Sequence, residues 1–377
     1  MKARICFFIL SFVMLFTTAV KADNPVSDDV DAKAYILIEQ STGKVLAEDK
    51  ADEKLPIASV TKIMTMLLIM EAIDDGVIAL DDMVEVSENA MSYGGSTMFL
   101  ETGEKLSVHD MLKGIAVASA NDGCVAMAEH LTGSESAFVD AMNKRAKELG
   151  MNNTNFMNTN GLDEDNHYSS ARDVSIMSRE LLKHPKITEY TSIWMDELRD
   201  GKFQLANTNK LIRFYTGANG LKTGSTSQAL CCLSASAKRD GMQLIAVVLG
   251  SPTSDKRFSS ARALLDYGFA NYKINSLVDK KEKICDANII NGTEDTVNAI
   301  AKESKFILCE KNNNKEIKRR VFLNDDIKAP IKRNDVLGYT EFVRDGEVVD
   351  KVDIISEKDV KKKGIGRIIK DIVVGFM

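Results

Sequence analysis

The most informative segment of the sequence is residues 57–65, Ile57-Ala58-Ser59-Val60-Thr61-Lys62-Ile63-Met64-Thr65. It opens a long apolar segment, residues 60–72, which follows Pro56 and predicts a buried helix. Ser59 then lies at the N-terminus of this helix, where backbone N–H groups and the helix dipole favour developing negative charge. Lys62 follows three residues later and shares a helix face with Ser59, so its amine can reach the serine hydroxyl.

A Ser-x-x-Lys pair can act as nucleophile and base only in a suitable environment. A free lysine has a pKa of about 10.4 and is protonated at neutral pH. Burial or a nearby positive charge lowers that pKa and frees the amine to take a proton. The pair therefore predicts a pocket and a second cation. A second such pair, Ser41 and Lys44, falls at a predicted turn between strands, and we interpret it as structural.

Two further triplets supply the groups that this chemistry needs. Ser119-Ala120-Asn121 follows an apolar helical segment and offers a hydroxyl to relay protons and an amide to bind a peptide. Lys222-Thr223-Gly224 begins a late strand region. It offers the second cation, a hydroxyl for a carboxylate, and a glycine that lets a substrate backbone approach closely. Each triplet is common by chance, but their joint occurrence in this order is much less common.

Strand patterns lie at both ends of this region and helical patterns lie in its middle. The strands are predicted at residues 34–39, 45–47, 220–223, 229–237 and 242–249. Further helices are predicted at residues 108–118, 137–149, 174–182 and 257–272. The order predicts an α/β (α+β) domain over residues 30–274, in which a sheet assembled from both ends receives an inserted helical subdomain.

A second domain is expected because 377 residues exceed the usual size of a single domain. After about residue 275 the sequence changes to short alternating apolar runs, such as 306–308, 321–323 and 352–355. Asp345-Gly346 is a hairpin-turn signal. Residues 275–360 therefore predict a small all-β domain.

The N-terminus predicts export. Lys2 and Arg4 precede a nearly uncharged apolar run at residues 5–20, and small residues follow at positions suited to cleavage after Ala22. We interpret residues 1–22 as a signal peptide, because the run is shorter than the roughly 20 residues of a membrane span. An uncleaved anchor helix is the alternative.

The C-terminus predicts a helix that lies on a membrane. Residues 361–363 are lysines, and the apolar residues after them fall on one helical face: Ile365, Ile368, Ile369, Ile372, Val373 and Phe376. The segment is too short to span a bilayer, and a basic polar face suits the membrane interface. Residues 361–377 thus predict an amphipathic membrane-anchoring helix, with a helix docked on the β-rich domain or a fraying tail as alternatives.

Several other kinds of chemistry are not indicated. The net charge of −6 gives no reason to expect nucleic-acid binding. The four histidines form no metal-binding motif, no cysteine pair has ligand spacing, and we expect neither a metal nor a cofactor. Removal of Cys6 with the signal peptide leaves an odd number of cysteines, which we interpret as buried small hydrophobic residues: Cys124, Cys231, Cys232, Cys285 and Cys309.

The three motifs, in this order, resemble those of penicillin-binding proteins and serine β-lactamases. Longer runs resemble the low-molecular-weight penicillin-binding proteins that act as serine-type D-Ala-D-Ala carboxypeptidases of the peptidase S11 type, most closely the subgroup of spore-forming bacteria. These runs are residues 57–65, Asn158-Thr159-Asn160-Gly161-Leu162-Asp163, residues 218–226 and Leu265-Asp266-Tyr267-Gly268-Phe269. Residues 331–338 and the terminal helix resemble the C-terminal domain and membrane anchor of that family.

The resemblance implies a β-lactamase/transpeptidase-like domain with an antiparallel sheet, and it implies roles for named residues. Ser59 would attack the carbonyl of the penultimate D-alanine, and Lys62 would take its proton. Ser119 and Lys222 would link proton transfer to the departing D-alanine, and Asn121 would hold the substrate backbone.

The resemblance also implies a substrate-binding strand. The N–H groups of Ser59 and Ser225 would form the oxyanion hole beside Gly224, and Thr223 with Arg257 would bind the terminal carboxylate. The implied partners are the peptidoglycan stem pentapeptide, β-lactam antibiotics as covalent inhibitors, and the outer face of the cytoplasmic membrane, without nucleic acid. Two positions depart from the family pattern: Ala120 stands where glycine is usual, and Ser225 stands where histidine is frequent.

Two other functions share these motifs. A class A-like β-lactamase needs a carboxylate that positions a deacylating water, but residues 158–170 contain Glu164 without the Glu-x-x-x-Asn pattern. A non-catalytic wall-binding protein on the same scaffold would not need Ser59, Lys62, Ser119 and Lys222 together. The carboxypeptidase is the interpretation that uses all of the motifs.

Overall fold

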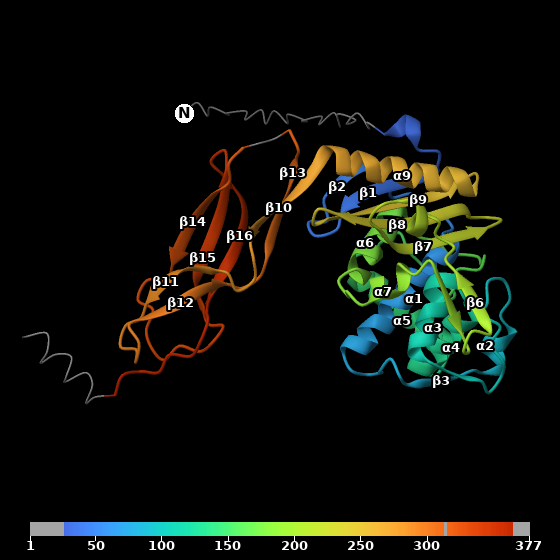
Figure 1. The fold of residues 1–377 in the computed structure, drawn as a ribbon, viewed down its shortest axis with the longest axis horizontal. Helices are drawn as coiled ribbons and strands as arrows, with labels where there is room; N and C mark the ends of the chain where they lie inside the picture. Colours follow the sequence, from blue (N-terminus) through green and yellow to red (C-terminus); the bar gives the residue numbers. More distant parts are fainter. Residues whose placement is uncertain (1–25, 313–314, 365–377) are drawn as a thin grey trace, which may run out of the picture.

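The computed structural model describes residues 26–312 and 315–364, which form a larger domain and a β-domain beside it (Figure 1). The larger domain is built on a five-stranded sheet in the order β2-β1-β9-β8-β7, with neighbouring strands antiparallel. Its strands are β1 (Ala34–Glu39), β2 (Val45–Asp49), β7 (Ala218–Thr226), β8 (Leu230–Arg239) and β9 (Met242–Ser251). Because β1 pairs with β9, both ends of the domain meet in one sheet, which confirms the predicted architecture.

Helices cover both faces of this sheet. Helix α9 (Ser254–Asn271) lies on one face, and α1 (Lys62–Asp74) and α6 (Ala171–Leu181) lie on the other (Figure 1). Every residue of β1 is buried, because alternate side chains enter two separate cores. Ile36 and Ile38 pack into the core on the side of α1, whereas Tyr35 and Leu37 pack into the core beneath α9.

The helical subdomain lies between the two ends of the sheet along the chain, as predicted. Its packing centres on α1, whose first half is buried on all sides. The other helices of the subdomain are α2 (Glu88–Ser92), α3 (Val108–Lys113), α4 (Asn121–Thr132), α5 (Glu135–Glu148) and α7 (Ile187–Thr191). Helix α8 (Leu211–Phe214) instead places Leu211 in the core beneath α9.

The structure differs from the prediction in two ways: it contains additional short strands, and two helices have irregular turns at their ends. The region predicted as mostly helical also contains two small antiparallel strand pairs, β3 (Met83–Glu85) with β4 (Lys105–Ser107) and β5 (Met195–Leu198) with β6 (Phe203–Ala206). Strands this short show no alternation that a sequence pattern could reveal. In addition, α1 is preceded by a 3₁₀ turn, Ala58–Thr61, and α3 continues into a π-helical turn, Gly114–Ala118.

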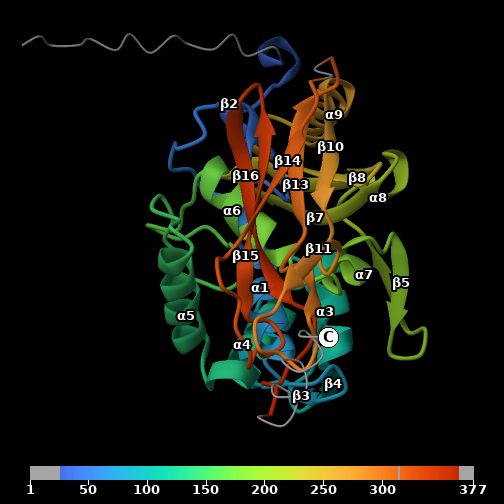
Figure 2. The same cartoon turned by 90° about the vertical axis from the view of Figure 1, so that its left-hand side faces the viewer.

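The β-domain contains two antiparallel sheets, which confirms the all-β prediction. One pairs β10 (Tyr272–Val278) with β13 (Lys305–Glu310), and the other has the order β11-β12-β16-β15-β14. The remaining bounds are β11 (Lys283–Asn288), β12 (Thr296–Ala301), β14 (Lys318–Leu323), β15 (Val336–Arg344) and β16 (Glu347–Ser356). Strands β15 and β16 join at the predicted Asp345-Gly346 turn, where both residues have positive φ. Figure 2 shows these strands in front of the larger domain.

The two predicted terminal segments lie largely outside the described residues. The expected signal peptide, residues 1–22, and residues 365–377 of the expected anchor helix are not described. Residues 361–364 are not helical, and they run beside the β-domain with Lys362 bridged to Gly292 and the N–H of Thr293 bonded to the carbonyl of Lys361 at 2.7 Å. Within the described ranges, no helix is both long and apolar enough to cross a membrane.

Candidate active site

The predicted nucleophile lies on the strained turn that leads into α1. Ala58 has a positive φ of 48°, which is unusual for a residue with a side chain. Ser59 follows it and is partly exposed, whereas Lys62 is fully buried. The Nζ of Lys62 lies 2.9 Å from the Oγ of Ser59. The structure thus brings the predicted serine and lysine into direct hydrogen-bond contact.

Lys62 is surrounded by neutral hydrogen-bond acceptors. Its Nζ donates to Oδ1 of Asn121 and to the backbone carbonyl of Asn160, both at 2.7 Å. Among the described residues it makes no ion pair, and burial lowers its pKa from 10.5 to about 8. An appreciable fraction of the amine is therefore neutral near neutral pH and can accept the proton of Ser59.

The second motif lies where the π-helical turn ends and α4 begins. Ser119 takes a left-handed conformation with φ of 65°, which places Asn121 at the start of α4. Both side chains are almost fully buried, and the Nδ2 of Asn121 donates to the carbonyl of Gly94 at 2.7 Å. Ala120 is completely buried in the core. Its methyl group, the first departure from the family pattern, therefore faces away from the solvent-accessible site.

Lys222 supplies the predicted second cation from β7. Its side chain is buried, and its Nζ donates to the carbonyl of Thr223 at 2.9 Å. Burial, followed by repulsion from the charge of Lys62, holds the pKa of Lys222 well below its usual value. The two amines, 160 positions apart by their numbering, therefore share one buried site.

Glycines allow two segments to close on the nucleophile turn. A Cβ at Gly224 on β7 would lie only 2.8 Å from the backbone nitrogen of Ser59. On the other side, Gly161 has a φ of 88°, and a Cβ there would lie 1.9 Å from the carbonyl oxygen of Ala58. Ser225 follows Gly224 and is exposed at the site. The arrangement brings the N–H group of Ser59 close to the strand that carries Ser225.

Thr223 contacts a residue that the sequence analysis did not identify. Its Oγ1 donates to Oγ1 of Thr208 at 2.6 Å. Thr208 stands between Asn207 and Asn209, two buried residues whose side-chain amides bind the backbone carbonyls of Ile193 and Gly220. An Asn-x-Asn pattern beside an apolar run is only a weak sequence signal for such an anchored segment.

Arg257 lies on α9 and contacts the backbone of β7. It is 6% exposed, and its Nη1 donates to the carbonyls of Gly224 at 2.9 Å and Cys232 at 3.2 Å. Its Nη2 donates to Oγ of Ser254 at 3.2 Å. In this arrangement the guanidinium braces β7 against β8 and α9, and its part in carboxylate binding stays a prediction.

The loop at residues 158–170 contributes Asn160 and His167, which the sequence analysis gave no role. The side chain of Asn160 is buried, and its backbone carbonyl accepts from Lys62. The Nδ1 of His167 accepts from the N–H of Met157, so Nε2 carries the proton and donates to Oγ1 of Thr61 at 2.8 Å. His167 therefore ties this loop to the nucleophile turn.

The second Ser-x-x-Lys pair lies elsewhere, as predicted. Ser41 and Lys44 are exposed at the turn between β1 and β2, and the Oγ of Ser41 donates to the carboxylate of Glu39. The five described cysteines are unpaired; Cys124, Cys232 and Cys309 are buried, but Cys231 and Cys285 are partly exposed. No group of three or more His, Cys, Asp or Glu residues could hold a metal ion in the part of the chain that the structure describes.

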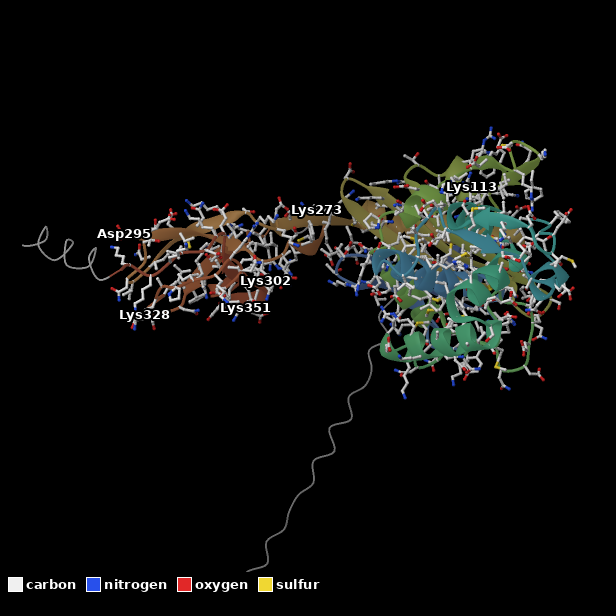
Figure 3. The ribbon with its side chains drawn as sticks, turned by 90° about the horizontal axis from the view of Figure 1, so that it is seen from below. Lys113, Lys273, Asp295, Lys302, Lys328 and Lys351 are labelled. Carbon is white, nitrogen blue, oxygen red and sulfur yellow. The ribbon has the colours of Figure 1, made fainter. Side chains whose placement is uncertain are left out.

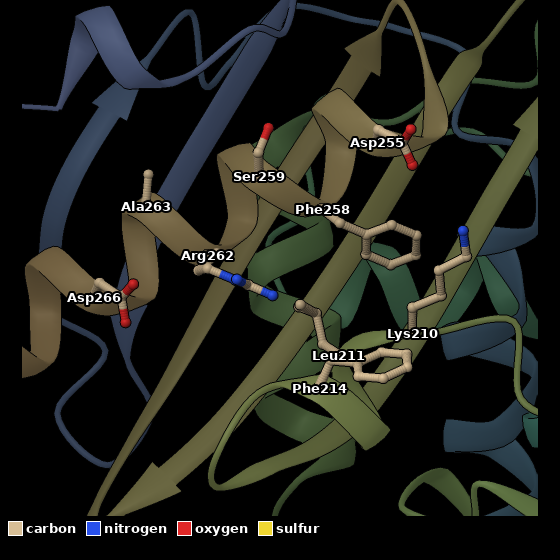
Figure 4. A pocket seen from close by; sticks show the side chains of 9 residues that line it. All are labelled: Lys210, Leu211, Phe214, Asp255, Phe258, Ser259, Arg262, Ala263 and Asp266. Atoms are coloured by element: carbon tan, nitrogen blue, oxygen red, sulfur yellow. The ribbon is translucent and has the colours of Figure 1, made fainter.

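A pocket of about 480 Å³ lies between α8 and α9 (Figure 4). Phe214 and Phe258 line it together with Lys210, Arg262 and Asp266. It contains none of the predicted site residues. The predicted residues Ser59, Lys62 and Asn121 instead contact one another apart from this pocket.

Comparisons with known proteins agree with this geometry. Residues 18–253 match the family model described as D-alanyl-D-alanine carboxypeptidase, and residues 272–362 match the Penicillin-binding protein 5, C-terminal domain. The D-alanyl-D-alanine carboxypeptidase DacF of Bacillus subtilis is 44% identical over 366 residues, which cover 94% of each chain. The D-alanyl-D-alanine carboxypeptidase DacC of Escherichia coli is 34% identical, and the match covers 97% of this chain and 94% of DacC.

Solved structures show the same fold. Penicillin binding protein 5 from Haemophilus influenzae aligns with a TM-score of 0.73 and 33% identity, covering 88% of this chain and 98% of that one. Penicillin-Binding Protein D2 from Listeria monocytogenes, in the ampicillin-bound form, aligns with a TM-score of 0.58 and 32% identity, covering 64% of this chain and 98% of that one. The chain therefore belongs to the D-alanyl-D-alanine carboxypeptidase family, as its three motifs predicted.

Proposed function

We propose that the protein removes the terminal D-alanine from peptidoglycan stem pentapeptides through an acyl-enzyme on Ser59. The observation that carries this proposal is the 2.9 Å contact between Ser59 Oγ and the buried, neutralisable amine of Lys62, with Lys222 as a second amine in the same site. Family membership gives the reaction, and this contact supports the assignment of the nucleophile and the base.

In the first step, neutral Lys62 takes the proton of Ser59 while Oγ attacks the carbonyl carbon of the penultimate D-alanine. The N–H groups of Ser59 and Ser225 stabilise the oxyanion, each donor lowering the barrier by roughly 3 kcal/mol. Collapse of the tetrahedral intermediate breaks the peptide bond. The departing amine of D-alanine receives its proton through Ser119 and Lys222.

Substrate binding uses strand β7 and the start of helix α4, which both lie beside Ser59. The backbone of the stem peptide lies along β7, where Gly224 permits close approach, and Asn121 donates to a substrate carbonyl. Thr223 binds the terminal carboxylate, with Arg257 adding positive charge from behind the strand. Water then hydrolyses the ester on Ser59 and releases the shortened peptide.

β-Lactams should acylate Ser59 by the same route and remain bound. The neighbours that hydrogen-bond to Lys62 are Ser59, Asn121 and Asn160, so no carboxylate bonds to the base. Glu164 accepts a hydrogen bond from the amide of Asn158 within the loop. Slow turnover of penicillin is therefore expected, which separates this enzyme from a class A-like β-lactamase.

The location that we propose is the outer face of the cytoplasmic membrane. The apolar run at residues 5–20 would direct export, and, because residues 361–364 run beside the β-domain, residues 365–377 would hold the mature protein on the membrane surface. The substrate, a component of the cell wall, is found on that side of the membrane.

The decisive experiment compares Ser59→Ala with Ser41→Ala, since both serines belong to Ser-x-x-Lys pairs. Wild type and Ser41→Ala should release D-alanine from a pentapeptide and take up fluorescent penicillin. Ser59→Ala should do neither. Label retained on Ser59→Ala would place the nucleophile elsewhere, fast penicillin hydrolysis would indicate a β-lactamase, and absence of all activity in wild type would indicate a binding protein.

A further inference from the structure

A pocket of about 730 Å³ opens beside Asn121, whose side chain contacts Gly94 in the pocket wall. Gly94 and Gly95 join the pocket to the site: the carbonyl of Gly94 accepts from Asn121 Nδ2, and a Cβ at Gly95 would lie 3.0 Å from that nitrogen. A substrate whose backbone is held by Asn121 would therefore pass the mouth of this pocket. Its walls include Met91, Tyr93, Phe99, Leu100, Glu101 and Thr102.

Phe99 is the most unusual residue of the pocket. Its φ is 53°, a conformation that is an outlier for a bulky residue, and its side chain is 73% exposed. The backbone on either side is held firmly, since Asp122 accepts from the N–H groups of Met98 and Leu100. A strained backbone that presents an apolar ring to solvent costs stability, and such features cluster at functional sites.

Arg199 holds the same segment from the other side. Its guanidinium donates to the carbonyls of Met98 at 2.9 Å and Phe99 at 3.2 Å, and it pairs with Glu104 at 2.6 Å. The ring of Phe99 contacts Phe203 edge to face, with centroids 5.9 Å apart. The pocket wall is therefore fixed in position, which a specificity site requires.

The charge of the pocket is negative. Glu101 is exposed at its rim and makes no ion pair within residues 26–312 and 315–364, although its charge, like that of Asp122, raises the pKa of Arg199. Asp122 is buried behind it, and Arg199, the cation that faces this segment, is already paired with Glu104. Tyr93 donates to the carboxylate of Glu135. Apolar walls with a free carboxylate at the rim suit an aliphatic chain that ends in an ammonium group.

We infer that this pocket is a subsite for the side chain of the stem-peptide residue that precedes D-Ala-D-Ala, and that Glu101 selects a side chain ending in a primary amine. Met91, Tyr93 and Phe99 contact its methylene groups. The inference rests on the proposed function, because it places the peptide backbone at Asn121.

The test uses three tripeptides, Nα-acetyl-X-D-Ala-D-Ala, in which X is L-lysine, Nε-acetyl-L-lysine or L-glutamate. The full enzyme should release D-alanine from the lysine peptide with a kcat/KM about fivefold above that for the acetylated peptide, as an exposed ion pair allows. The glutamate peptide should be the poorest substrate. The rate of acylation by benzylpenicillin, which lacks this side chain, serves as the reference for an intact site.

Two matched charge reversals complete the test. Glu101→Lys should abolish the preference for lysine and favour the glutamate peptide, while benzylpenicillin acylation stays within twofold of wild type. Glu347→Lys, at an exposed position of the β-domain, is the control and should leave the order of the three peptides unchanged. Phe99→Ala should lower kcat/KM for the lysine peptide about fivefold and leave penicillin acylation unchanged.

Either of two results would overturn the inference. One is an unchanged order of the three peptides in Glu101→Lys; the other is a parallel loss of peptide turnover and penicillin acylation, which would indicate a structural role. Failure of the proposed function looks different, because wild type would then release no D-alanine from any of the peptides.

Discussion

At the scale of single residues, the proposed reactivity of the site depends on a buried lysine that has no carboxylate bonded to its amine. Lys62 donates to a serine, an amide and a backbone carbonyl, and none of these neutralises an ammonium group. Burial therefore lowers the pKa of Lys62 to about 8. The charge of Lys62 in turn lowers the pKa of Lys222, because two positive charges in one buried site are unfavourable.

This environment predicts a pH dependence of acylation. The neutral form of Lys62 is the reactive one, so the rate of acylation of Ser59 should rise as pH increases through about 8 and then level off. Stopped-flow acylation by penicillin between pH 6 and 10 measures this. Lys62→Arg keeps the charge but stays protonated, and it should lose at least about 100-fold in rate. A rate independent of pH over this range would exclude Lys62 as the base.

At the scale of elements, the site is formed where the loop at residues 158–170 and strand β7 close on the turn before α1. Gly161 approaches this turn from the loop, and Gly224 approaches it from β7. His167 then bonds the loop to Thr61 within the Ser-x-x-Lys motif. The proposed nucleophile, Ser59, is thus held in position by the loop at residues 158–170 and by β7 as well as by α1.

Gly161→Ala tests this closure. The new Cβ would lie 1.9 Å from the carbonyl of Ala58 at a φ of 88°, so the loop must move. We expect the free energy of unfolding to fall by about 3 kcal/mol and D-alanine release to fall at least tenfold. Gly150→Ala is the matched control, since its φ is 77° with open space around it, and it should cost only about 1–2 kcal/mol. Equal losses in the two variants would contradict the packing argument.

His167 predicts how the loop responds to acid. Burial lowers its pKa to about 4, whereas an unfolded histidine has a pKa of about 6.5. Between these values the unfolded state binds more protons, so this residue makes stability fall as pH decreases from 6.5 to 4, by about 3 kcal/mol in total. Chemical denaturation at pH 7 and pH 4.5 should show a smaller difference for His167→Gln than for wild type. Equal differences would show that this imidazole does not titrate as described.

Much of this site was predictable from sequence, because Ser-x-x-Lys, Ser-x-Asn and Lys-Thr-Gly use side chains whose types carry the signal. Asn160 was not predictable as a partner of Lys62, since it contributes a backbone carbonyl, which every residue has. The contact between Thr208 and Thr223 depends on tertiary packing that no local pattern records. For Arg257, spacing gave the residue but not the direction of its guanidinium, which the carbonyls of Gly224 and Cys232 determine.

At the scale of the whole molecule, the β-domain separates the catalytic cleft from the C-terminal end of the described chain. Figure 3 shows Lys273 where the two domains join and Asp295 at the far end of the β-domain. The Nζ of Lys363 lies 3.2 Å from Oδ1 of Asp295, which places the last described residues at that far end. An anchor beginning there would hold the active site away from the membrane surface by the length of the β-domain.

Truncation tests the anchor, and the structure determines where to cut. Residues 361–363 bond to residues 291–293 of the β-domain, so removing them would disturb its packing. Deletion of residues 365–377 leaves those bonds intact and removes the apolar face together with Arg367 and Lys370, whereas the lysines at 361–363 remain. The shortened enzyme should move from the membrane fraction to the soluble fraction, with D-alanine release unchanged.

Replacing Ile368 and Ile372 by aspartate in the full chain should have the same effect, because charges on the apolar face oppose insertion into the interface. Continued membrane association of both variants would show that another part of the molecule holds it there.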